Sequence, residues 1–399
     1  MAKERVDILI SGGGLAGLIA AAAFGHAGFT VAVADPAPPV SSAGAEGSDL
    51  RSTAFLSPAR ALMERVGIWD ALAPHATPLE VLEAVDSTGW PPEIRERRAF
   101  RSSDLGAGPF GWNLMNWLTR RELMGVLEAP ERVQLIWGAG VDRMLARDRE
   151  VIVTLTDGRR IAARLVVGAD GRNSAVRAAA GIEAQTTRYG QKALAFTVTH
   201  PVPHGHVSTE IYNRGGAFTM VPLNDQDGRH ASAIVWMNTG PRAVELAGMA
   251  EGDFEAEATE RSCHLFGPLR LETARRVWPV ITQRAERLTA PRTALVAEAA
   301  HVLPPIGAQG LNTSLHDVSA LLELAEAAPD SLGEDSMLAA YARARERDIA
   351  ARATVIDLFN RICRSGEAPI QALRRTGLKL VHDVAPVRKA VMQAGLGAR

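Results

Sequence analysis

The chain has 399 residues, of which 47% are hydrophobic and 22% are charged, and its formal net charge is −1. This length exceeds one small core and predicts two lobes that share an interface. The near-neutral charge excludes a general attraction to nucleic acid, so any attraction to a membrane must be local. The two cysteines, Cys263 and Cys363, form no CxxC pattern. This argues against a disulfide framework or a cysteine-based metal site and fits a reducing cytoplasm.

The N-terminal residues predict a βαβ unit. Val6–Ser11 reads as an apolar strand, Leu15–His26 as a helix and Thr30–Ala34 as a second strand. Gly12–Gly14 interrupts the apolar run, which a secretory signal has no reason to do. No other stretch reaches the ~18 apolar residues of a membrane-spanning helix. We therefore expect a cytoplasmic protein that does not cross a membrane.

Residues 12–17, GGGLAG, match the G-x-G-x-x-G pattern of dinucleotide-binding loops. Gly12 allows a tight turn, Gly14 lets a pyrophosphate approach the backbone, and Gly17 permits close packing of helix on strand. The start of the helix offers free N–H groups to the phosphates. Asp35, which ends the second strand, is placed to accept hydrogen bonds from an adenosine ribose. These features predict a dinucleotide site without separating NAD from FAD.

The middle of the chain has the character of short strands. Pro36–Asp49 reads as a surface loop, and Arg60–Val66 and Arg120–Leu127 as helices. The pair Asp157-Gly158 predicts a hairpin turn. The expected strands are Glu150–Thr156, Arg160–Val167, Ala193–Thr199, Val207–Asn213, Phe218–Val221, Ala231–Met237 and Arg292–Val296. After Ser314 the periodicity is helical.

Two further segments favour FAD. Residues 164–177, RLVVGADGRNSAVR, are a strand followed by a turn and a helix start. Residues 293–317, TALVAEAAHVLPPIGAQGLNTSLHD, are a strand, an acid, a Pro-Pro turn and a glycine-containing loop before a helix. Gly307 and Gly310 expose backbone N–H groups beside a positive helix end. Such an end stabilises the negative charge that an isoalloxazine ring gains on reduction.

Together these segments resemble the class A flavoprotein monooxygenases, and most closely the UbiH/UbiF family of ubiquinone-biosynthesis hydroxylases. The resemblance spans essentially the whole chain and includes residues 49–54 (DLRSTA), residues 120–123 (RREL), Tyr341, Arg347 and Asp348. It implies an FAD-dependent monooxygenase that hydroxylates an aromatic ring with O2, with NADH or NADPH reducing the flavin. No catalytic protein residue is expected, because the cofactor carries the chemistry. The implied substrate is a polyprenyl phenol on the way to ubiquinone, and other ubiquinone-biosynthesis proteins are expected partners.

The resemblance also implies which residues bind the cofactor. They are Gly12, Gly14, Ala16, Gly17, Asp35, Arg51, Arg120, Asp170, Gly171, Glu298, Pro305, Gly307, Gln309, Gly310, Leu311 and Asn312. On residue-level evidence alone, Arg51 and Arg120 fit ordinary surface arginines equally well. Two positions depart from the family pattern: Ala297-Glu298 replaces Gly-Asp, and Ser314 replaces a glycine. The longer Glu298 side chain changes the usual contact with the ribityl chain, although we expect FAD to bind.

The predicted fold is α/β, with a Rossmann-like FAD-binding domain, an inserted β-sheet substrate domain and C-terminal helices. The FAD-binding domain is expected at residues 1–180 and 286–365, and the substrate domain at 181–285. Phe218, Met220, Pro222 and Trp236 are candidate substrate-pocket residues, with a plain hydrophobic core as the alternative.

No metal site is expected, since His204 and His206 lack convincing further ligands. His301 is interpreted as a hydrogen-bonded or packed histidine rather than as a catalytic base.

Residues 366–399 are expected to form a basic amphipathic helical segment, which Pro386 splits into two pieces. Its basic residues are Arg374, Arg375, Lys379, Arg388, Lys389 and Arg399. Such a segment favours peripheral contact with the inner face of the cytoplasmic membrane. A helix that packs inward with one solvated face is the alternative.

Two functional alternatives remain open from the sequence. The first is a hydroxylase of soluble phenols, and the second is a poorly active flavin-binding protein with a structural role in a biosynthetic assembly. The sequence does not define the ring position that is hydroxylated or choose between NADH and NADPH.

Overall fold

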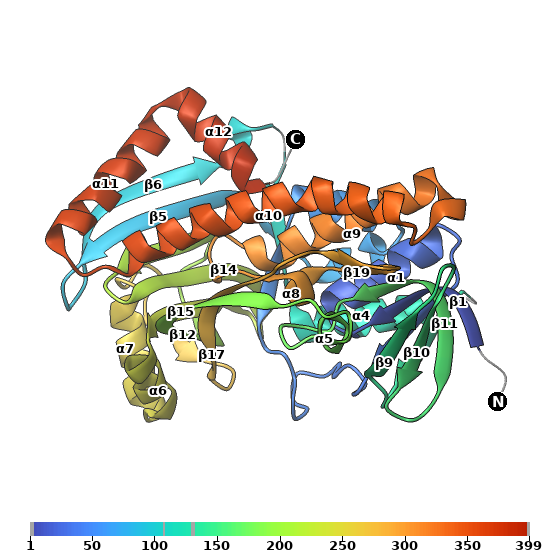
Figure 1. Ribbon diagram of the computed structural model, residues 1–399. Helices are drawn as coiled ribbons and strands as arrows, with labels where there is room; N and C mark the ends of the chain where they lie inside the picture. The colour runs from blue at the N-terminus through green and yellow to red at the C-terminus, as the bar shows by residue number, and fades with distance from the viewer. Residues whose placement is uncertain (1–3, 107, 129–131, 397–399) are drawn as a thin grey trace.

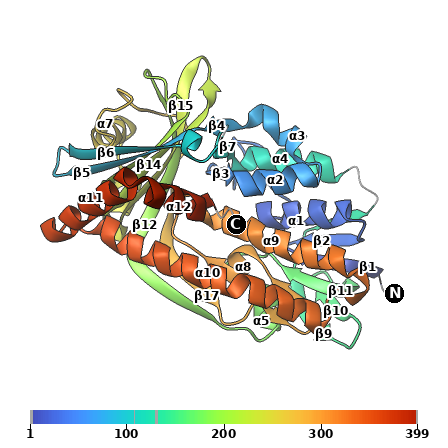
Figure 2. The same ribbon diagram turned by 90° about the horizontal axis from the view of Figure 1, so that it is seen from above.

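The computed structural model describes residues 4–106, 108–128 and 132–396. Two large sheets lie side by side and the long helix α10 (Asp335–Arg364) runs across both of them (Figure 1). The first sheet lies beside helices α1 (Leu15–His26) and α9 (Gln309–Ala327), as Figure 2 shows from above. The predicted α/β fold with a second, β-rich lobe is confirmed.

The first sheet is a parallel Rossmann-type sheet with an antiparallel hairpin at one side. Its path is β18-β19-β11-β1-β2-β8, and neighbours from β19 to β8 run parallel. These strands are β1 (Glu4–Ser11), β2 (Val31–Asp35), β8 (Val133–Trp137), β11 (Arg160–Gly168), β18 (Thr289–Ala290) and β19 (Thr293–Leu295). The predicted hairpin around Asp157-Gly158 joins β10 (Val151–Leu155) to β11, and β9 (Val141–Ala146) pairs with β10.

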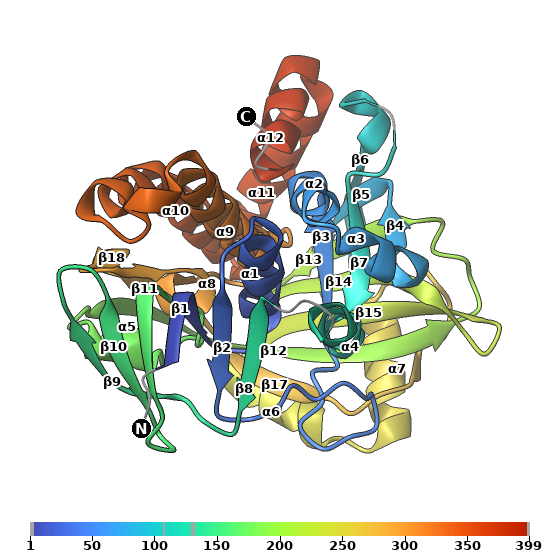
Figure 3. The same ribbon diagram turned by 90° about the vertical axis from the view of Figure 1, so that its right-hand side faces the viewer.

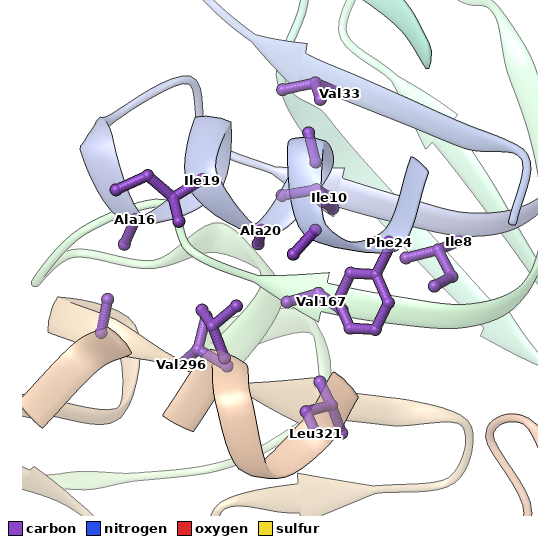
Figure 4. Packing of buried hydrophobic residues seen from close by; sticks show 14 of the residues in the cluster. Ile8, Ile10, Ala16, Ile19, Ala20, Phe24, Val33, Val167, Val296 and Leu321 are labelled. Carbon is purple, nitrogen blue, oxygen red and sulfur yellow. The ribbon is translucent and has the colours of Figure 1, made fainter. Parts of the chain in front are cut away.

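Helix α1 forms the centre of the first core because almost every residue in it is apolar and buried. Figure 4 shows Ile19 and Phe24 of α1 packed near Ile10 of β1 and Val167 of β11. Leu321 of α9 belongs to the same cluster. A helix that is apolar all round must be covered on every side. Sheet, α9 and α4 (Asn116–Leu127) provide that cover.

The second sheet has nine strands and holds most of the predicted insert. Its path is β20-β17-β12-β15-β14-β13-β5-β6, with β16 paired to β12. The strands are β5 (Val81–Thr88), β6 (Glu93–Arg101), β12 (Ala184–His200), β13 (Val207–Asn213), β14 (Gly216–Gln226), β15 (Arg229–Thr239), β16 (Arg270–Leu271), β17 (Arg276–Ala285) and β20 (His301–Val302). Helices α6 (Gly240–Gly248) and α7 (Glu251–Arg261) cover its outer face (Figure 3).

The pairing of β5 and β6 differs from what the sequence indicates. Their residues lie in the range expected for the FAD-binding domain, yet β5 runs parallel to β13 and extends the second sheet. Parallel strands are joined by a long crossover and not by a short turn, so no turn residues in the sequence indicate this pairing. The chain therefore crosses to the second sheet once before the predicted insert begins.

Shorter elements complete the fold. A small sheet contains β3 (Ser52–Leu56), β4 (Thr77–Leu79) and β7 (Gly111–Met115). The remaining helices are α2 (Ser57–Arg65), α3 (Trp69–Leu72), α5 (Ala175–Ala179) and α8 (Ala297–Ala300), with 3-10 turns at Ala73–His75, Ser102–Asp104 and Pro329–Ser331. Among the described residues, no helix is both long and apolar enough to cross a bilayer.

The C-terminal helices α11 (Ala368–Asp383) and α12 (Ala385–Leu396) lie over β5 and β6 (Figure 1). Pro386 stands in the first turn of α12, so the predicted break is confirmed. Leu378, Val381 and Met392 pack against the buried cluster that contains Phe100 of β6. One face of this helical pair is therefore fixed to the second sheet.

Candidate active site

A cavity of about 940 Å³ lies between the carboxyl ends of the parallel strands and one face of the second sheet. This volume is at the upper end of the ~300–1,000 Å³ range of small-molecule sites. The predicted cofactor-binding residues that line it are Gly12, Gly14, Ala16, Asp35, Arg51, Arg120, Asp170, Gly171, Glu298, Pro305, Gly307, Gln309, Gly310 and Leu311. Gly17 and Asn312 contact this wall from behind. Segments more than 250 residues apart in sequence are thus brought to one cavity.

The glycine loop after β1 has the shape that a pyrophosphate requires. Gly12 has a φ of +111°, and a Cβ there would lie 2.4 Å from the Ala169 carbonyl oxygen. A Cβ at Gly17 would lie 2.0 Å from the Gly12 carbonyl oxygen. Gly14 has no heavy atom within 4 Å of its Cβ position and is the N-cap of α1. The absence of a Cβ at Gly12 and Gly17 lets the turn pack closely on the adjoining backbone. Gly14 leaves open space at the N-terminus of α1, where a phosphate can bind.

Two carboxylates lie at the carboxyl ends of β2 and β11, the strands on either side of β1. Asp35 accepts hydrogen bonds from the backbone N–H groups of Gly13 (2.7 Å) and Ala37 (2.9 Å). Asp170 accepts from the Ser11 hydroxyl (3.2 Å) and from the backbone N–H of Val176 (3.1 Å). Each acid therefore fixes the loop that follows its strand and also presents a negative edge to the cavity.

The loop before β3 contributes an arginine pair around one acid. The Arg51 guanidinium donates two 2.7 Å hydrogen bonds to Asp49 and stacks 5.0 Å from the Trp278 ring centre. Arg120 Nη2 lies 3.8 Å from the same carboxylate. Burial would raise the pKa of the Asp49 carboxyl, but the hydrogen bonds and charge of Arg51 hold it below its ordinary value. Neither arginine is an ordinary surface residue.

The segment after β19 is held by a buried ion cluster. Ala297 adopts a left-handed φ of +56°, the conformation that the usual family glycine would adopt without strain. Its N–H donates to Asp317 Oδ2 (3.2 Å), which also accepts from His301 Nε2 (2.6 Å), while Arg345 Nε donates to Oδ1 (2.8 Å). Burial raises the pKa of Asp317, but His301 and Arg345 outweigh it and keep the group ionised. His301 is thus a hydrogen-bonded histidine, as the sequence indicates.

Glu298 projects from this segment toward solvent. Its side chain is 48% exposed and lies 4.0 Å from Arg172 Nε. It lines the cavity, so the longer acid still reaches the expected region. Its contact with a ribityl chain stays a prediction.

The loop before α9 and the first turn of α9 line the cavity and also contact the small sheet and α12. Ala308, the N-cap of α9, has a φ of +55°. The Asn312 side chain donates to the carbonyls of Ala54 and Ala308 and accepts from the N–H of Leu56. Gln309 donates to the Gly395 carbonyl at 2.8 Å, so α12 is tied to this loop. Asn312 therefore positions the loop from behind the cavity wall.

Comparisons with known proteins identify the family. A family model described as "FAD binding domain" matches residues 5–355. The ubiquinone hydroxylase UbiL of Rhodospirillum rubrum is 32% identical over 99% of this chain and 90% of its own length. This chain is a member of the FAD-dependent ubiquinone hydroxylase family. The 3-demethoxyubiquinol 3-hydroxylase of Escherichia coli is 26% identical over the full length of both chains. The fold matches p-nitrophenol 4-monooxygenase PnpA of Pseudomonas putida with a TM-score of 0.80 at 18% identity, covering 99% and 100% of the chains.

This hydroxylase is an FAD-dependent aromatic monooxygenase, and the residues present fit the cofactor. The open space at Gly14 and the start of the 19-residue helix α9 suit phosphate and a reduced ring. Arg120 Nε is buried without a hydrogen-bond partner in the described part of the chain, as expected of a group that awaits a polar ligand. When bound, FAD supplies the redox chemistry that activates O2, and NADH or NADPH serves as its reductant. The protein binds, orients and shields it.

The substrate-pocket residues expected from sequence lie on the other face of the second sheet. Phe218, Met220 and Trp236 are fully buried against Phe254 of α7 and are absent from the cavity wall. Pro222 is also buried outside that wall. Side chains of a strand alternate between faces, so the neighbours of these residues face the cavity instead. The residues that do so are Ala193, Ala195, Ser208, Glu210, Thr219, Val221 and Val235.

Several residues of the site are not predicted by any motif in the sequence. Glu210, Trp278 and Asn113 line the cavity but belong to no local motif. Asp317 is the last residue of the segment 293–317, and its partner Arg345 lies on the next helix, α10. In the ranges 4–106, 108–128 and 132–396, no cluster of three or more His, Cys, Asp or Glu side chains could hold a metal ion.

Proposed function

We propose that this hydroxylase acts on the ring of a polyprenylated phenol of ubiquinone biosynthesis, using O2 and NADH or NADPH. The observation that carries this proposal is the apolar wall of the cavity on the second sheet. Val235 pairs with Ala195 and with Thr219 across neighbouring strands, and Val221 lies beside them. Leu82 and Leu303 extend the apolar lining.

An aromatic ring with an isoprenoid tail would gain binding free energy by packing against this apolar wall. Removing apolar surface from water contributes about 25 cal/mol per Å². The names of the relatives, ubiquinone hydroxylase and 3-demethoxyubiquinol 3-hydroxylase, support a quinol or phenol of the same pathway.

The test measures NAD(P)H oxidation and product together. The purified holoenzyme should oxidise NADH or NADPH faster when a prenylated phenol is added, with hydroxylated product in matching amount. A phenol without the prenyl tail should have a much lower kcat/KM. Equal kcat/KM for both phenols favours a soluble substrate, and no stimulation by either favours a structural flavoprotein. A strain that lacks this protein should accumulate the unhydroxylated intermediate, which mass spectrometry identifies.

We also propose that helices α10, α11 and α12 make peripheral contact with a membrane through apolar side chains. Leu373, Leu380 and Val391 are 60%, 61% and 47% exposed, and Val355 and Leu358 of α10 are 66% and 59% exposed. A substrate that partitions into lipid must be met at the surface of the bilayer. Exposed aliphatic side chains near the C-terminal helices can insert there.

The basic residues contribute less to such contact than the sequence indicates. Arg374 is buried and paired with Asp86, Lys379 lies 3.0 Å from Glu96, and Arg388 lies 3.1 Å from Asp104. Among the described residues, Arg375 and Lys389 have no carboxylate within 4 Å, and Arg399 lies outside the described range. Each basic residue near an anionic membrane surface contributes about 1 kcal/mol of binding free energy. With two such residues, we expect membrane binding to be only modestly sensitive to salt.

Co-sedimentation with vesicles of anionic and zwitterionic lipid tests this contact. The paired substitutions Leu373→Ser and Leu380→Ser should reduce binding to both, whereas Arg375→Gln with Lys389→Gln should reduce only the anionic increment. Undiminished sedimentation of the Leu373→Ser, Leu380→Ser protein would contradict the proposed contact.

A further inference from the structure

Glu210 is a buried carboxyl in the wall of the substrate cavity. It lies on β13, is 7% exposed, and lines the cavity. It is paired with Ala84 of β5 and Thr219 of β14, and the row continues to Val235. Among these four residues, Glu210 is the one with an ionisable side chain. A buried acid is commonly neutralised by a salt bridge, and in the described part of the chain Glu210 has none.

One hydroxyl donor and one backbone N–H face this carboxyl where the second sheet meets the loop before α9. The Tyr212 hydroxyl donates to Glu210 Oε2. The backbone N–H of Gly307, in the loop before α9, faces the carboxyl and favours its ionised form. Gly307 itself lines the cavity, so Glu210 lies where the second sheet meets the predicted cofactor loop.

Burial raises the pKa of Glu210, and the two donors oppose that rise only in part. The charged and titratable groups behind it are Tyr212, Cys363 of α10, and the Asp86–Arg374 pair of β5 and α11. The Asp86–Arg374 pair is mutually neutralised, and burial keeps Tyr212 and Cys363 protonated. Glu210 is therefore the carboxyl of this cluster that has no paired cation in the described part of the chain, and its pKa is raised above the ordinary glutamate value.

The other acids of the cavity are less suited to meet a substrate hydroxyl. Asp35 and Asp170 hold backbone N–H groups at the loops of the first sheet, and Asp49 is paired with Arg51. Glu298 is half exposed. Glu210 alone among the described cavity-lining acids projects from the apolar sheet wall.

We propose that Glu210 accepts the hydrogen bond of the substrate's ring hydroxyl and takes up its proton during oxygen transfer. This rests on the proposed function. The substrate O–H bond breaks, the proton bonds to a carboxylate oxygen, and the electron pair stays on the ring oxygen. That pair raises the electron density of the ring, which favours attack on an electrophilic oxygen. When the ring becomes aromatic again, the C–H bond of the hydroxylated carbon breaks, its electron pair returns to the ring and its proton passes to water, while the proton on Glu210 returns to the ring oxygen.

A binding comparison tests the contact without turnover. The probes are 2-geranylphenol and its O-methyl ether, and binding to the holoenzyme is followed by the change in flavin absorbance. Wild type should bind the phenol more tightly than the ether, and Glu210→Gln should lower that preference on the order of tenfold, because a charged acceptor is replaced by a neutral one. Glu346→Gln, an exposed acid on α10, is the matched control and should keep the wild-type preference. An unchanged preference in Glu210→Gln overturns the inference alone, while absence of phenol binding to wild type overturns the proposed function with it.

Turnover tests the proton step. Glu210→Gln should retain FAD and hydroxylate the phenol about 10²–10⁴-fold more slowly than wild type, the usual effect of losing a general base. In wild type, kcat/KM should rise with pH through a limb above the ordinary glutamate pKa of about 4.3. Tyr212→Phe removes a donor that lowers the pKa of Glu210, so it should move this limb to higher pH, whereas Glu210→Gln should abolish it. A wild-type rate and pH limb in Glu210→Gln would show that the carboxyl has only a structural role.

Discussion

Arg374 offers the clearest test of how the C-terminal helices are held. Its Nε donates to Asp86 Oδ1 at 2.5 Å, and its Nη1 and Nη2 donate to the carbonyls of Cys363 (3.2 Å) and Ser87 (3.4 Å). The side chains of Arg374 and Asp86 are only 4% and 5% exposed. Replacing Arg374 with Gln removes the positive charge and leaves the carboxylate of Asp86 buried without a counter-ion.

The expected loss is large because the pair is shielded from water. Two charges about 4 Å apart interact by about 4 kcal/mol at an effective dielectric constant of about 20. Breaking a buried pair costs about 3–5 kcal/mol in measured cases. At about 2.1 cal/mol/K per residue, the 399-residue chain has an unfolding entropy of about 0.8 kcal/mol/K. Arg374→Gln should therefore lower Tm by about 4–6 °C.

Thermal unfolding followed by circular dichroism and by release of flavin fluorescence measures this change. Arg375→Gln is the matched control, since Arg375 is the exposed neighbour, and its effect should stay within about 0.5 kcal/mol. Adding Asp86→Asn to Arg374→Gln should recover much of the loss, because the stranded charge is removed. If Arg374→Gln and Arg375→Gln melt at the same temperature, the buried pair does not hold the helices.

Three further predictions concern the cofactor site. Gly14→Val fills the open space at the start of α1 and should yield colourless protein; full flavin absorbance after gel filtration would refute the loop assignment. Glu298→Ala should weaken FAD binding by about 1 kcal/mol, roughly fivefold in Kd, whereas Glu298→Asp should be tolerated. An unchanged Kd in Glu298→Ala removes that residue from the site. Asp317→Asn should destabilise the fold by about 3–5 kcal/mol, because Arg345 loses its buried partner. The pKa of Asp317 is lowered in the fold, so its contribution is complete above the unfolded value of about 4 and is lost as pH falls through the folded value. Urea unfolding of Asp317→Asn should lack this acid-dependent loss, and an identical pH dependence would count against the ion cluster.

The elements that the sequence predicts well are those whose causes are local. The βαβ unit follows from apolar periodicity, and the Asp157-Gly158 hairpin follows from its turn residues. Gly12 and Gly17 are constrained by atoms of the same loop and of the adjoining strand, so the motif already contains their explanation. The break before Pro386 is equally local, because proline lacks the N–H that a continuous helix needs.

Tertiary structure decided which face of each element meets the cavity. Alternation in β14 and β15 is visible in the sequence, but both faces are apolar, so nothing local showed that Val221 rather than Met220 lines the cavity. The parallel pairing of β5 with β13 depends on contacts between distant segments. It also explains why Arg374, which reads as one more positive charge on a surface helix, is buried against Asp86. Glu210 belongs to no motif, and only the approach of the Gly307 loop to the second sheet turns it from a strand residue into part of a site. Local sequence determines the elements and their turns, whereas burial and charge partners arise from distant segments that come together only in the folded chain.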